Sequence, residues 1–320
     1  MTRVAAVDLG TNATRLLVAD IANGRVDEVE RRLTFTRLGE GVDARRRLLP
    51  LPIARVRNCL ADYRRELEAL GAERTLAVAT SAVRDAENGE AFLGEVEWSY
   101  GFATRLLSGE EEALLTLRGV TAGRTLEPGT LIVDVGGGST ELVLGGPGGV
   151  AFHTSLDMGC VRHTELHLHA DPPAQDELLA CAASARSLLD RHVPEPVRRQ
   201  ARRAIGVAGT VTTLAALDLG LERYDPERVH AHRVGRDSLA AQFVRLLVPL
   251  AERRLLPALE PERAPVIVAG AVVLQEVMDF FGLDELEASE RDLLHGAALA
   301  AAELPERVEG DAPPGAYTCC

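Results

Sequence analysis

The sequence predicts an α/β protein made of two domains of related fold, each a mixed sheet flanked by helices, with a cleft between them. Three observations support this prediction. A strand–turn–strand pattern occurs twice, strand-like segments alternate with segments of helical period, and the 320-residue chain is about twice the length of a typical domain. A hydrophobic content of 46% is enough to supply two cores.

The repeat is the strongest of the three. Residues 7–18 read VDLGTNATRLLV and residues 133–144 read VDVGGGSTELVL, and five positions coincide at a constant offset of 126 (134 − 8). Because internal repeats determine architecture, we interpret this match as a duplication. Each copy would offer an aspartate, Asp8 or Asp134, and a turn rich in hydroxyl groups to the shared cleft.

The glycine turn of the second copy is not one of the common nucleotide motifs. A P-loop needs a lysine after its second glycine, but all 35 basic residues of this chain are arginine. A dinucleotide motif needs spaced glycines followed by a helix, whereas these three contiguous glycines lead into a second apolar run, residues 142–144. The turn therefore predicts a hairpin that exposes backbone N–H groups and hydroxyls.

The elements of the first half follow from periodicity and end signals. Apolar residues at helical spacing predict a helix over residues 53–70, and Gly71 is suited to end it. Ser108 is the predicted N-cap of a later helix, with Glu111 at its third position completing a capping box. The strands expected in this half are at 4–7, 16–19, 76–79 and 103–107, with residues 25–33 as a strand that extends the first hairpin.

In the second half, residues 174–201 are predicted to be mostly helical. A strand at 204–207 is expected to lead into a helix that begins near residue 208, and a similar strand at 266–268 to lead into 269–282. The helix at 291–303 is expected to pack back on the first domain. The predicted units are an N-terminal domain (1–125), a C-terminal domain (126–303) and a disordered tail (304–320).

Composition limits the possible environments and partners. The net charge of −13 argues against non-specific nucleic-acid binding, and the longest apolar run is too short to cross a membrane. Five cysteines without a regular spacing indicate reduced thiols rather than a disulfide framework. We therefore expect a cytoplasmic protein without nucleic-acid or membrane partners, and a homodimer remains an open alternative.

Five motifs carry a family resemblance. The segments VDLGTNATRLL, ATSAVRDAEN, LSGEEEA, VDVGGGSTELV and GVAGTVTTLAAL occur in an order that resembles the exopolyphosphatase and guanosine pentaphosphate phosphohydrolase family of the short, two-domain type. The resemblance extends to about residue 300. It implies two duplicated ribonuclease-H-like domains of the actin-like ATPase superfamily.

The resemblance also implies roles for individual residues. Glu112, the last glutamate of GEEEA, would be the general base, and Mg²⁺ or Mn²⁺ would be held by the carboxylates Asp134, Glu141 and Asp8. One departure is the segment Asp292–Gly296, where many members carry an arginine that is absent here. The phosphate-binding residues implied by the resemblance are Thr11, Asn12, Arg15, Arg37, Ser81, Arg84, Gly136, Gly137, Gly138, Ser139 and Thr140.

The activity implied by the resemblance is the metal-dependent release of terminal phosphate from inorganic polyphosphate. Guanosine pentaphosphate and nucleoside tri- or diphosphates present the same terminal anhydride and remain alternative substrates. A phosphate-ligand sensor with little turnover is an alternative of a different class. A sugar kinase would need a separate aspartate base, for which the sequence offers no distinct motif.

Overall fold

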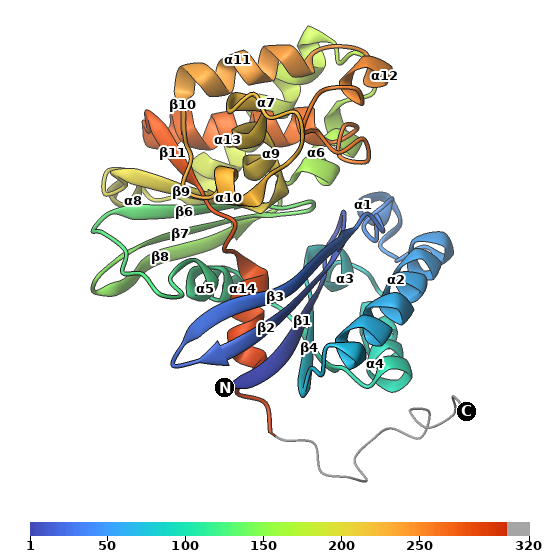
Figure 1. Cartoon of the computed structure of the whole chain (residues 1–320). Helices are drawn as coiled ribbons and strands as arrows, with labels where there is room; N and C mark the ends of the chain where they lie inside the picture. The colour runs from blue at the N-terminus through green and yellow to red at the C-terminus, as the bar shows by residue number, and fades with distance from the viewer. Residues whose placement is uncertain (306–320) are drawn as a thin grey trace. The chain divides into compact units, whose positions relative to one another are not determined.

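The computed structural model describes residues 1–305, which form two compact units (Figure 1). The first unit comprises Met1–Arg124 together with the segment that begins at Arg291, and the second comprises Thr125–Glu290. Residues 306–320, with Cys319 and Cys320 and most of the predicted tail, lie outside the described residues.

The first unit is built on a five-stranded mixed sheet with the order β3-β2-β1-β4-β5. The first three strands form an antiparallel meander, while β4 lies parallel to β1 and β5 lies parallel to β4. All five predicted strands are confirmed. Their bounds are β1 (Thr2–Leu9), β2 (Thr14–Ala22), β3 (Arg25–Thr34), β4 (Arg74–Ala79) and β5 (Ala103–Leu106).

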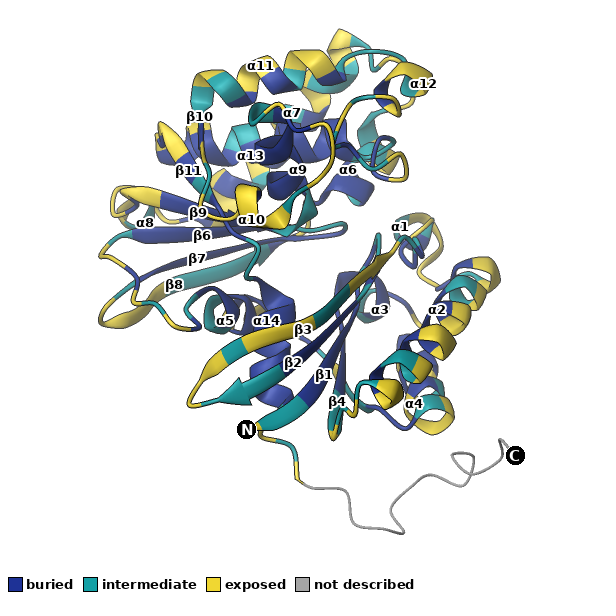
Figure 2. Ribbon diagram, in the orientation of Figure 1, coloured by how far each residue is buried: buried dark blue, intermediate teal, exposed yellow. Residues whose placement is uncertain are grey.

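Helices cover both faces of this sheet. Alternate side chains of a strand point to opposite faces, so β1 contributes residues to an apolar cluster on each face. Ala5 and Val7 of β1 join the apolar cluster that contains residues of α2 and α4, whereas Val4 and Ala6 join the cluster that contains residues of α5 and α14. In Figure 2 the central strand β1 is largely buried and the edge strand β3 is largely exposed. The helices are α1 (Val42–Arg45), α2 (Pro50–Ala69), α3 (Ser81–Arg84), α4 (Gly89–Tyr100), α5 (Gly109–Val120) and α14 (Leu293–Ala301).

Two glycines bring α5 and α14 into close contact. A Cβ atom added to Gly119 would lie 1.9 Å from Asp292 O, and one added to Gly296 would lie 1.9 Å from Leu115 O. Any side chain at either position would therefore separate the two helices. Because of this packing, α14, the last described helix, belongs to the first unit.

The second unit repeats the arrangement. Its six-stranded sheet has the order β10-β11-β9-β6-β7-β8, so the run from β8 to β11 reproduces the strand order and directions of the first sheet and β10 is added at the edge. This shared topology confirms the duplication predicted from the repeat. The strands are β6 (Thr130–Val135), β7 (Thr140–Gly146), β8 (Gly149–Leu156), β9 (Arg203–Val207), β10 (Arg233–Gly235) and β11 (Glu285–Ala288).

One predicted strand is wrong. Residues 266–268 are not extended, because α13 already begins at Ile267 and Ile267 N donates to Arg263 O as in a helix. A short run of buried β-branched residues has the same composition in a buried helix as in a buried strand, so periodicity does not separate the two. The helices of this unit are α6 (Cys160–His167), α7 (Gln175–His192), α8 (Glu195–Arg198), α9 (Ala208–Asp218), α10 (Pro226–Val229), α11 (Arg236–Leu246), α12 (Leu250–Arg253) and α13 (Ile267–Phe281).

The predicted end of the long helix is confirmed. Helix α2 ends at Ala69, and Gly71 follows with a φ of 74° that suits glycine. Cys59, Cys160 and Cys181 are free, buried thiols. Among residues 1–305, no helix combines the length and the apolar character needed to cross a bilayer.

Candidate functional site

The first phosphate-type turn joins β1 to β2. Gly10 N donates to Ala13 O at 3.1 Å and closes the turn directly beyond the last strand pair, Leu9 with Thr14. A Cβ atom on Gly10 would lie 2.8 Å from the same Ala13 oxygen. The tight closure therefore depends on glycine at this position.

The loop after β3 sets the direction of this turn. Arg37 N donates to Asn12 O at 2.9 Å, and Gly39 N donates to Thr11 O at 2.8 Å. Because the C=O and N–H of a trans peptide point in opposite directions, the N–H groups of Asn12 and Ala13 face away from this loop. Arg37, a predicted phosphate ligand, thus lies beside the turn and supports it through its backbone.

Side chains around this turn include unsatisfied polar atoms. The hydroxyls of Thr11 and Ser81, both buried, are 2.9 Å apart. Within the described residues, Asn12 Nδ2 and Asp8 Oδ1 are buried without a hydrogen-bond partner. Since buried polar atoms are nearly always paired, one orphaned donor and one orphaned acceptor beside the same turn suggest room for a polar ligand.

Asp8 is also part of a buried ion-pair network. Arg15 donates from Nε to Asp8 Oδ2 at 2.8 Å, and its Nη1 pairs with Asp292, the N-cap of α14. Burial raises the pKa of Asp8, and Arg15 offsets this only in part. Burial acts in the same direction on Asp292, but Arg15 and His295 help to hold its pKa well below the usual range. Arg15, a predicted phosphate ligand, therefore already contacts two carboxylates.

Glu112 is buried at the start of α5. Only 7% of the residue is exposed, and its Oε2 lies 3.3 Å from Nη1 of Arg84, which also donates to Leu107 O at 3.0 Å. Helix α3 connects this pair with the turn, because its first residue, Ser81, contacts Thr11 and its last residue is Arg84.

The neighbouring glutamate has a different environment. Ser108 Oγ accepts from Glu111 N at 3.2 Å and Glu111 Oε2 accepts from Ser108 N at 2.8 Å, which confirms the predicted capping box. The backbone N–H of Ser108 lowers the pKa of the exposed Glu111. Helical rotation turns Glu112, one position later, to the buried face.

The second turn joins β6 to β7 and repeats the first. Gly136 N donates to Ser139 O at 3.0 Å, the same bond as in the first turn at an offset of 126 residues. The cross-strand pair in front of it is Asp134 with Glu141, where the first unit has Asp8 with Arg15. Two carboxylates thus occupy the position that holds an ion pair in the first unit.

Helix α6 fixes the direction of the second turn. Cys160 N donates to Gly136 O at 2.9 Å, and Val161 N donates to Gly137 O at 2.8 Å. A Cβ atom on Gly159 would lie 2.4 Å from Gly137 O, so this approach requires glycine at the start of α6. The opposite N–H groups of the same peptides therefore face away from α6.

The polar residues at the end of this turn are buried. Thr140 Oγ1 donates to Met158 O at 2.5 Å, and Ser155 Oγ donates to Glu141 Oε1 at 2.7 Å. Asp134 and Glu141 are 6% and 1% exposed. Across the part of the chain that the structure describes, no group of three or more His, Cys, Asp or Glu side chains is arranged to hold a metal ion.

The family follows from comparison with known proteins. The model of the Ppx/GppA phosphatase family matches residues 17–303. The chain belongs to this family. The chain is 40% identical to Exopolyphosphatase 2 of Mycobacterium tuberculosis, over 94% of this chain and 99% of the relative.

Two further comparisons place the chain within the Ppx/GppA family. It is 35% identical to an exopolyphosphatase-like protein of known crystal structure, with a TM-score of 0.89 and coverage of 93% and 97% of the two chains. It is 29% identical to the guanosine-5'-triphosphate,3'-diphosphate pyrophosphatase of Aeromonas hydrophila, over 91% of this chain and 58% of that protein. As a Ppx/GppA phosphatase, the chain is an enzyme that hydrolyses phosphoanhydrides.

Sequence reasoning missed two residues near the turns. Arg162 of α6 donates from Nε to Gly138 O at 2.7 Å, and Asp292 holds Arg15. The three consecutive glycine carbonyls need donors, and this need is the signal that could have directed attention to α6. For Asp292, the signal is its place directly before Leu293 and Leu294, because an acidic residue before an apolar run is a common helix N-cap.

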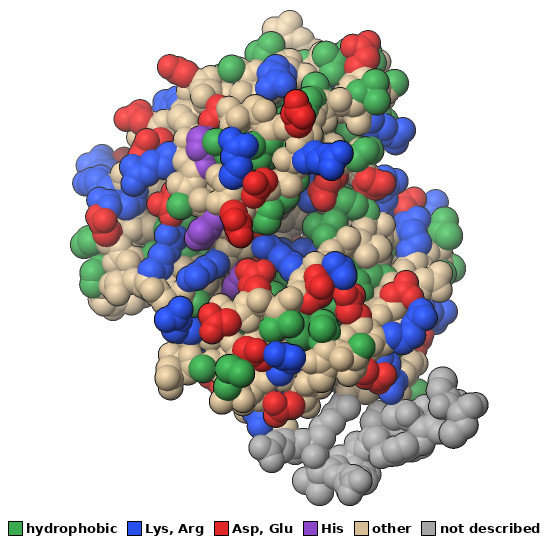
Figure 3. Space-filling model, viewed as in Figure 1, with side chains coloured by type: hydrophobic (Ala, Val, Ile, Leu, Met, Phe, Trp, Pro, Cys, Tyr) green, Lys and Arg blue, Asp and Glu red, His purple; other side chains and the backbone are tan. Residues whose placement is uncertain are grey.

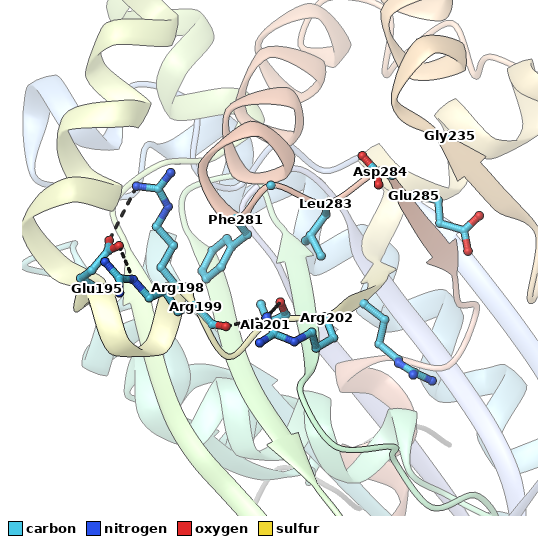
Figure 4. A pocket seen from close by; sticks show the side chains of 12 residues that line it. Glu195, Arg198, Arg199, Ala201, Arg202, Gly235, Phe281, Leu283, Asp284 and Glu285 are labelled. Atoms are coloured by element: carbon cyan, nitrogen blue, oxygen red, sulfur yellow. Dashed lines mark hydrogen bonds and ion pairs between the residues drawn. The ribbon is translucent and has the colours of Figure 1, made fainter.

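A basic pocket lies elsewhere in the second unit of this Ppx/GppA phosphatase. It is lined by residues of α8 and the segments that lead to β9 and β11 (Figure 4), and basic side chains gather over α8 in Figure 3. Arg199 donates to Glu195 at 2.9 Å, and Arg203 pairs with Glu127. Because these arginines are exposed and paired with carboxylates, we interpret this pocket as part of the solvated surface.

Proposed function

We propose that the chain releases terminal phosphate from inorganic polyphosphate in a divalent-metal-dependent reaction, with Glu112 as the general base. The observation that carries the proposal is the connection made by α3. Ser81 of this helix contacts the first turn through Thr11, and Arg84 contacts the buried Glu112. A base and a phosphate-type turn thus adjoin one short helix. Hydrolysis of a terminal anhydride needs both a base and a site that holds the phosphate.

In the proposed reaction, a water oxygen attacks the terminal phosphorus in line with the bridging oxygen. Glu112 accepts a proton from that water as the new P–O bond forms, and the bridging P–O bond breaks to release the shortened chain. Arg84, next to Glu112, would balance negative charge on the phosphoryl oxygens. The outward N–H groups of Asn12 and Ala13 and the orphaned Asn12 Nδ2 would donate to phosphate oxygens.

The second turn is proposed to bind phosphate in the same manner. Its hydroxyl residues, Ser139 and Thr140, follow Gly136–Gly138, and its N–H groups face away from α6. The basis of this proposal is the backbone match between the two turns rather than their composition alone.

The carboxylates of the second unit fit a divalent cation. Asp134 and Glu141 are direct cross-strand partners and nearly fully buried, and two such carboxylates are costly to ionise side by side unless a cation is present. Carboxylate oxygens are ligands that Mg²⁺ and Mn²⁺ prefer, and Mg²⁺ usually takes few of them, together with waters and substrate phosphates. When bound, the ion would neutralise charge on the phosphoryl oxygens. In the first unit, Asp8 Oδ1 is a further candidate ligand.

The substrate assignment has a specific competitor. The similarity to Exopolyphosphatase 2 spans nearly the whole of both proteins, which favours polyphosphate. The similarity to a guanosine-5'-triphosphate,3'-diphosphate pyrophosphatase keeps guanosine pentaphosphate as the alternative, because the reacting anhydride is the same.

A phosphate-release assay tests the proposal. Short polyphosphate, long polyphosphate, guanosine pentaphosphate and ATP would be compared with added Mg²⁺ and again with excess chelator. We expect the highest kcat/KM on polyphosphate and loss of release in chelator. Faster release from guanosine pentaphosphate would favour the alternative substrate, whereas binding without release would favour the sensor.

A further inference from the structure

Arg162 supports the glycine turn of the second unit through its side chain. It lies on the first turn of α6, its Nε donates to Gly138 O at 2.7 Å, and its side chain is only 13% exposed. Its backbone N–H also donates to Gly137 O, at 3.1 Å. Asp157 Oδ1 lies 4.0 Å from its Nη2 and balances part of its charge.

These bonds determine where three consecutive N–H groups point. In each trans peptide the N–H is opposite the C=O, so binding of the Gly136, Gly137 and Gly138 carbonyls from the α6 side turns the next three N–H groups away from α6. These N–H groups belong to Gly137, Gly138 and Ser139. Successive N–H groups on one side of a turn form a concave site for anions.

The last of the three peptides depends on Arg162. Backbone N–H groups of α6 hold the carbonyls of Gly136 and Gly137, whereas the bond to Gly138 O comes from the Arg162 side chain. Glycine allows both signs of φ, so the peptide between Gly138 and Ser139 has little intrinsic resistance to rotation. Rotation would replace a donor by a carbonyl oxygen, which repels phosphate.

We propose that Arg162 is a positioning residue that holds the Gly138–Ser139 peptide with its N–H towards bound phosphate. Its effect on phosphate is indirect, through the backbone of the turn. The inference rests on the proposed function in one respect, namely that the turn binds phosphate.

The experiment compares Arg162→Gln, Arg162→Lys and the control Arg199→Gln, which removes an exposed arginine of the same unit. Inorganic phosphate is the probe, its Kd is measured by calorimetry, and melting temperature monitors folding. We expect Arg162→Gln to weaken binding by about tenfold, the loss expected for one hydrogen bond. Arg162→Lys should recover part of the loss because its ammonium group retains a donor, and Arg199→Gln should bind like the wild type.

Hydrogen exchange separates positioning from direct contact with phosphate. The N–H groups of residues 160–162 donate to the glycine carbonyls, so their exchange in the ligand-free protein should accelerate in Arg162→Gln and not in Arg199→Gln. Unchanged exchange, unchanged Kd in Arg162→Gln, or equal weakening in Arg199→Gln would overturn the inference. Absence of polyphosphate hydrolysis in the wild type would count against the proposed function alone, because Kd and exchange need no turnover.

Discussion

The two turns share one backbone and differ in the residue opposite the aspartate. In the first unit Asp8 faces Arg15 across the strand pair, and in the second Asp134 faces Glu141. The closing hydrogen bonds, Gly10 to Ala13 and Gly136 to Ser139, are equivalent. The residue opposite the aspartate is therefore an arginine that pairs with it in the first unit and a second carboxylate in the second unit.

We propose that the two aspartates have different roles. The Asp8 carboxylate has a positive partner within the protein, because Arg15 pairs with both Asp8 and Asp292. At the position of Arg15 the second unit has Glu141, and we propose that a divalent cation supplies positive charge there. Duplication preserved the turn, and the side chain opposite the aspartate distinguishes the two copies.

The largest expected effect tests this division. Asp134→Asn removes one of two proposed metal ligands, so we expect at least a ~100-fold lower kcat at saturating substrate, with a raised requirement for Mg²⁺. Its melting temperature should change little, because relief of the carboxylate pair offsets the lost interactions. Phosphate release is measured as Mg²⁺ is titrated.

Asp8→Asn is the matched variant in the first unit. It leaves Arg15 buried with Asp292 as its remaining ion-pair partner, so the melting temperature should fall by several degrees. If both variants required more Mg²⁺ to the same extent, the proposed division of roles would be wrong.

The second expected effect concerns the helix that supports the second turn. His163 of α6 is 1% exposed, its two ring nitrogens lack partners within the described residues, and burial and the nearby His167 lower its pKa to about 4. Because the unfolded chain takes up this proton near pH 6.5, the contribution to stability is present above that pH and is lost as pH falls towards about 4. The loss from this group is about 3 kcal/mol at most.

Melting temperatures of the wild type and His163→Leu between pH 7.5 and pH 4, a range chosen to bracket both pKa values, measure this effect. The variant should lose less stability on acidification. Parallel curves for the two proteins would contradict the assignment of a buried neutral histidine.

His295 in the first unit provides a contrast of opposite sign. It lies 2.9 Å from Glu28 Oε1, and although burial lowers its pKa, hydrogen bonds to Asp292 and Glu28 raise it overall. Its contribution is therefore present at low pH and is lost as pH rises through the folded pKa. As pH rises, the stability of the wild type relative to His295→Gln should fall. Its stability relative to His163→Leu should rise instead.

The smallest expected effect concerns two glycines. Gly39 lets the loop after β3 approach the first turn, and Gly159 lets α6 approach the second turn. A Cβ on Gly159 would meet the backbone oxygen of Gly137 at 2.4 Å, whereas a Cβ on Gly39 would meet the side-chain methyl of Thr11 at 2.2 Å. Each alanine substitution should cost about 1–3 kcal/mol through overpacking.

The two variants should differ in rescue. Thr11→Ser removes the methyl group and keeps the hydroxyl that contacts Ser81, so it should restore stability and activity to Gly39→Ala. No side-chain change of this kind is available for Gly159→Ala. Failure of Thr11→Ser to rescue Gly39→Ala would show that the Gly39 conflict is not with this methyl group.

The sequence was most informative where local rules decide the structure. The repeat predicted both turns, and the serine–glutamate spacing predicted the capping box that distinguishes Glu111 from Glu112. Residues 266–268 were misassigned because a buried apolar run fits a helix or a strand. Arg162 and Asp292 were missed because their partners, Gly138 and Arg15, are distant in sequence and carry no periodic signal. The shared cleft for both turns stays a prediction.

The most direct test of the proposed chemistry compares two adjacent glutamates. Glu112→Gln keeps shape and helix propensity and removes the proposed base, so it should fold normally and release phosphate at least ~100-fold more slowly. Glu111→Gln alters the capping box, so it should stay active and lose about 0.5–2 kcal/mol of stability. Phosphate release and melting temperature measured side by side decide the matter. Equal loss of rate in both variants, or loss in neither, would contradict the role of Glu112.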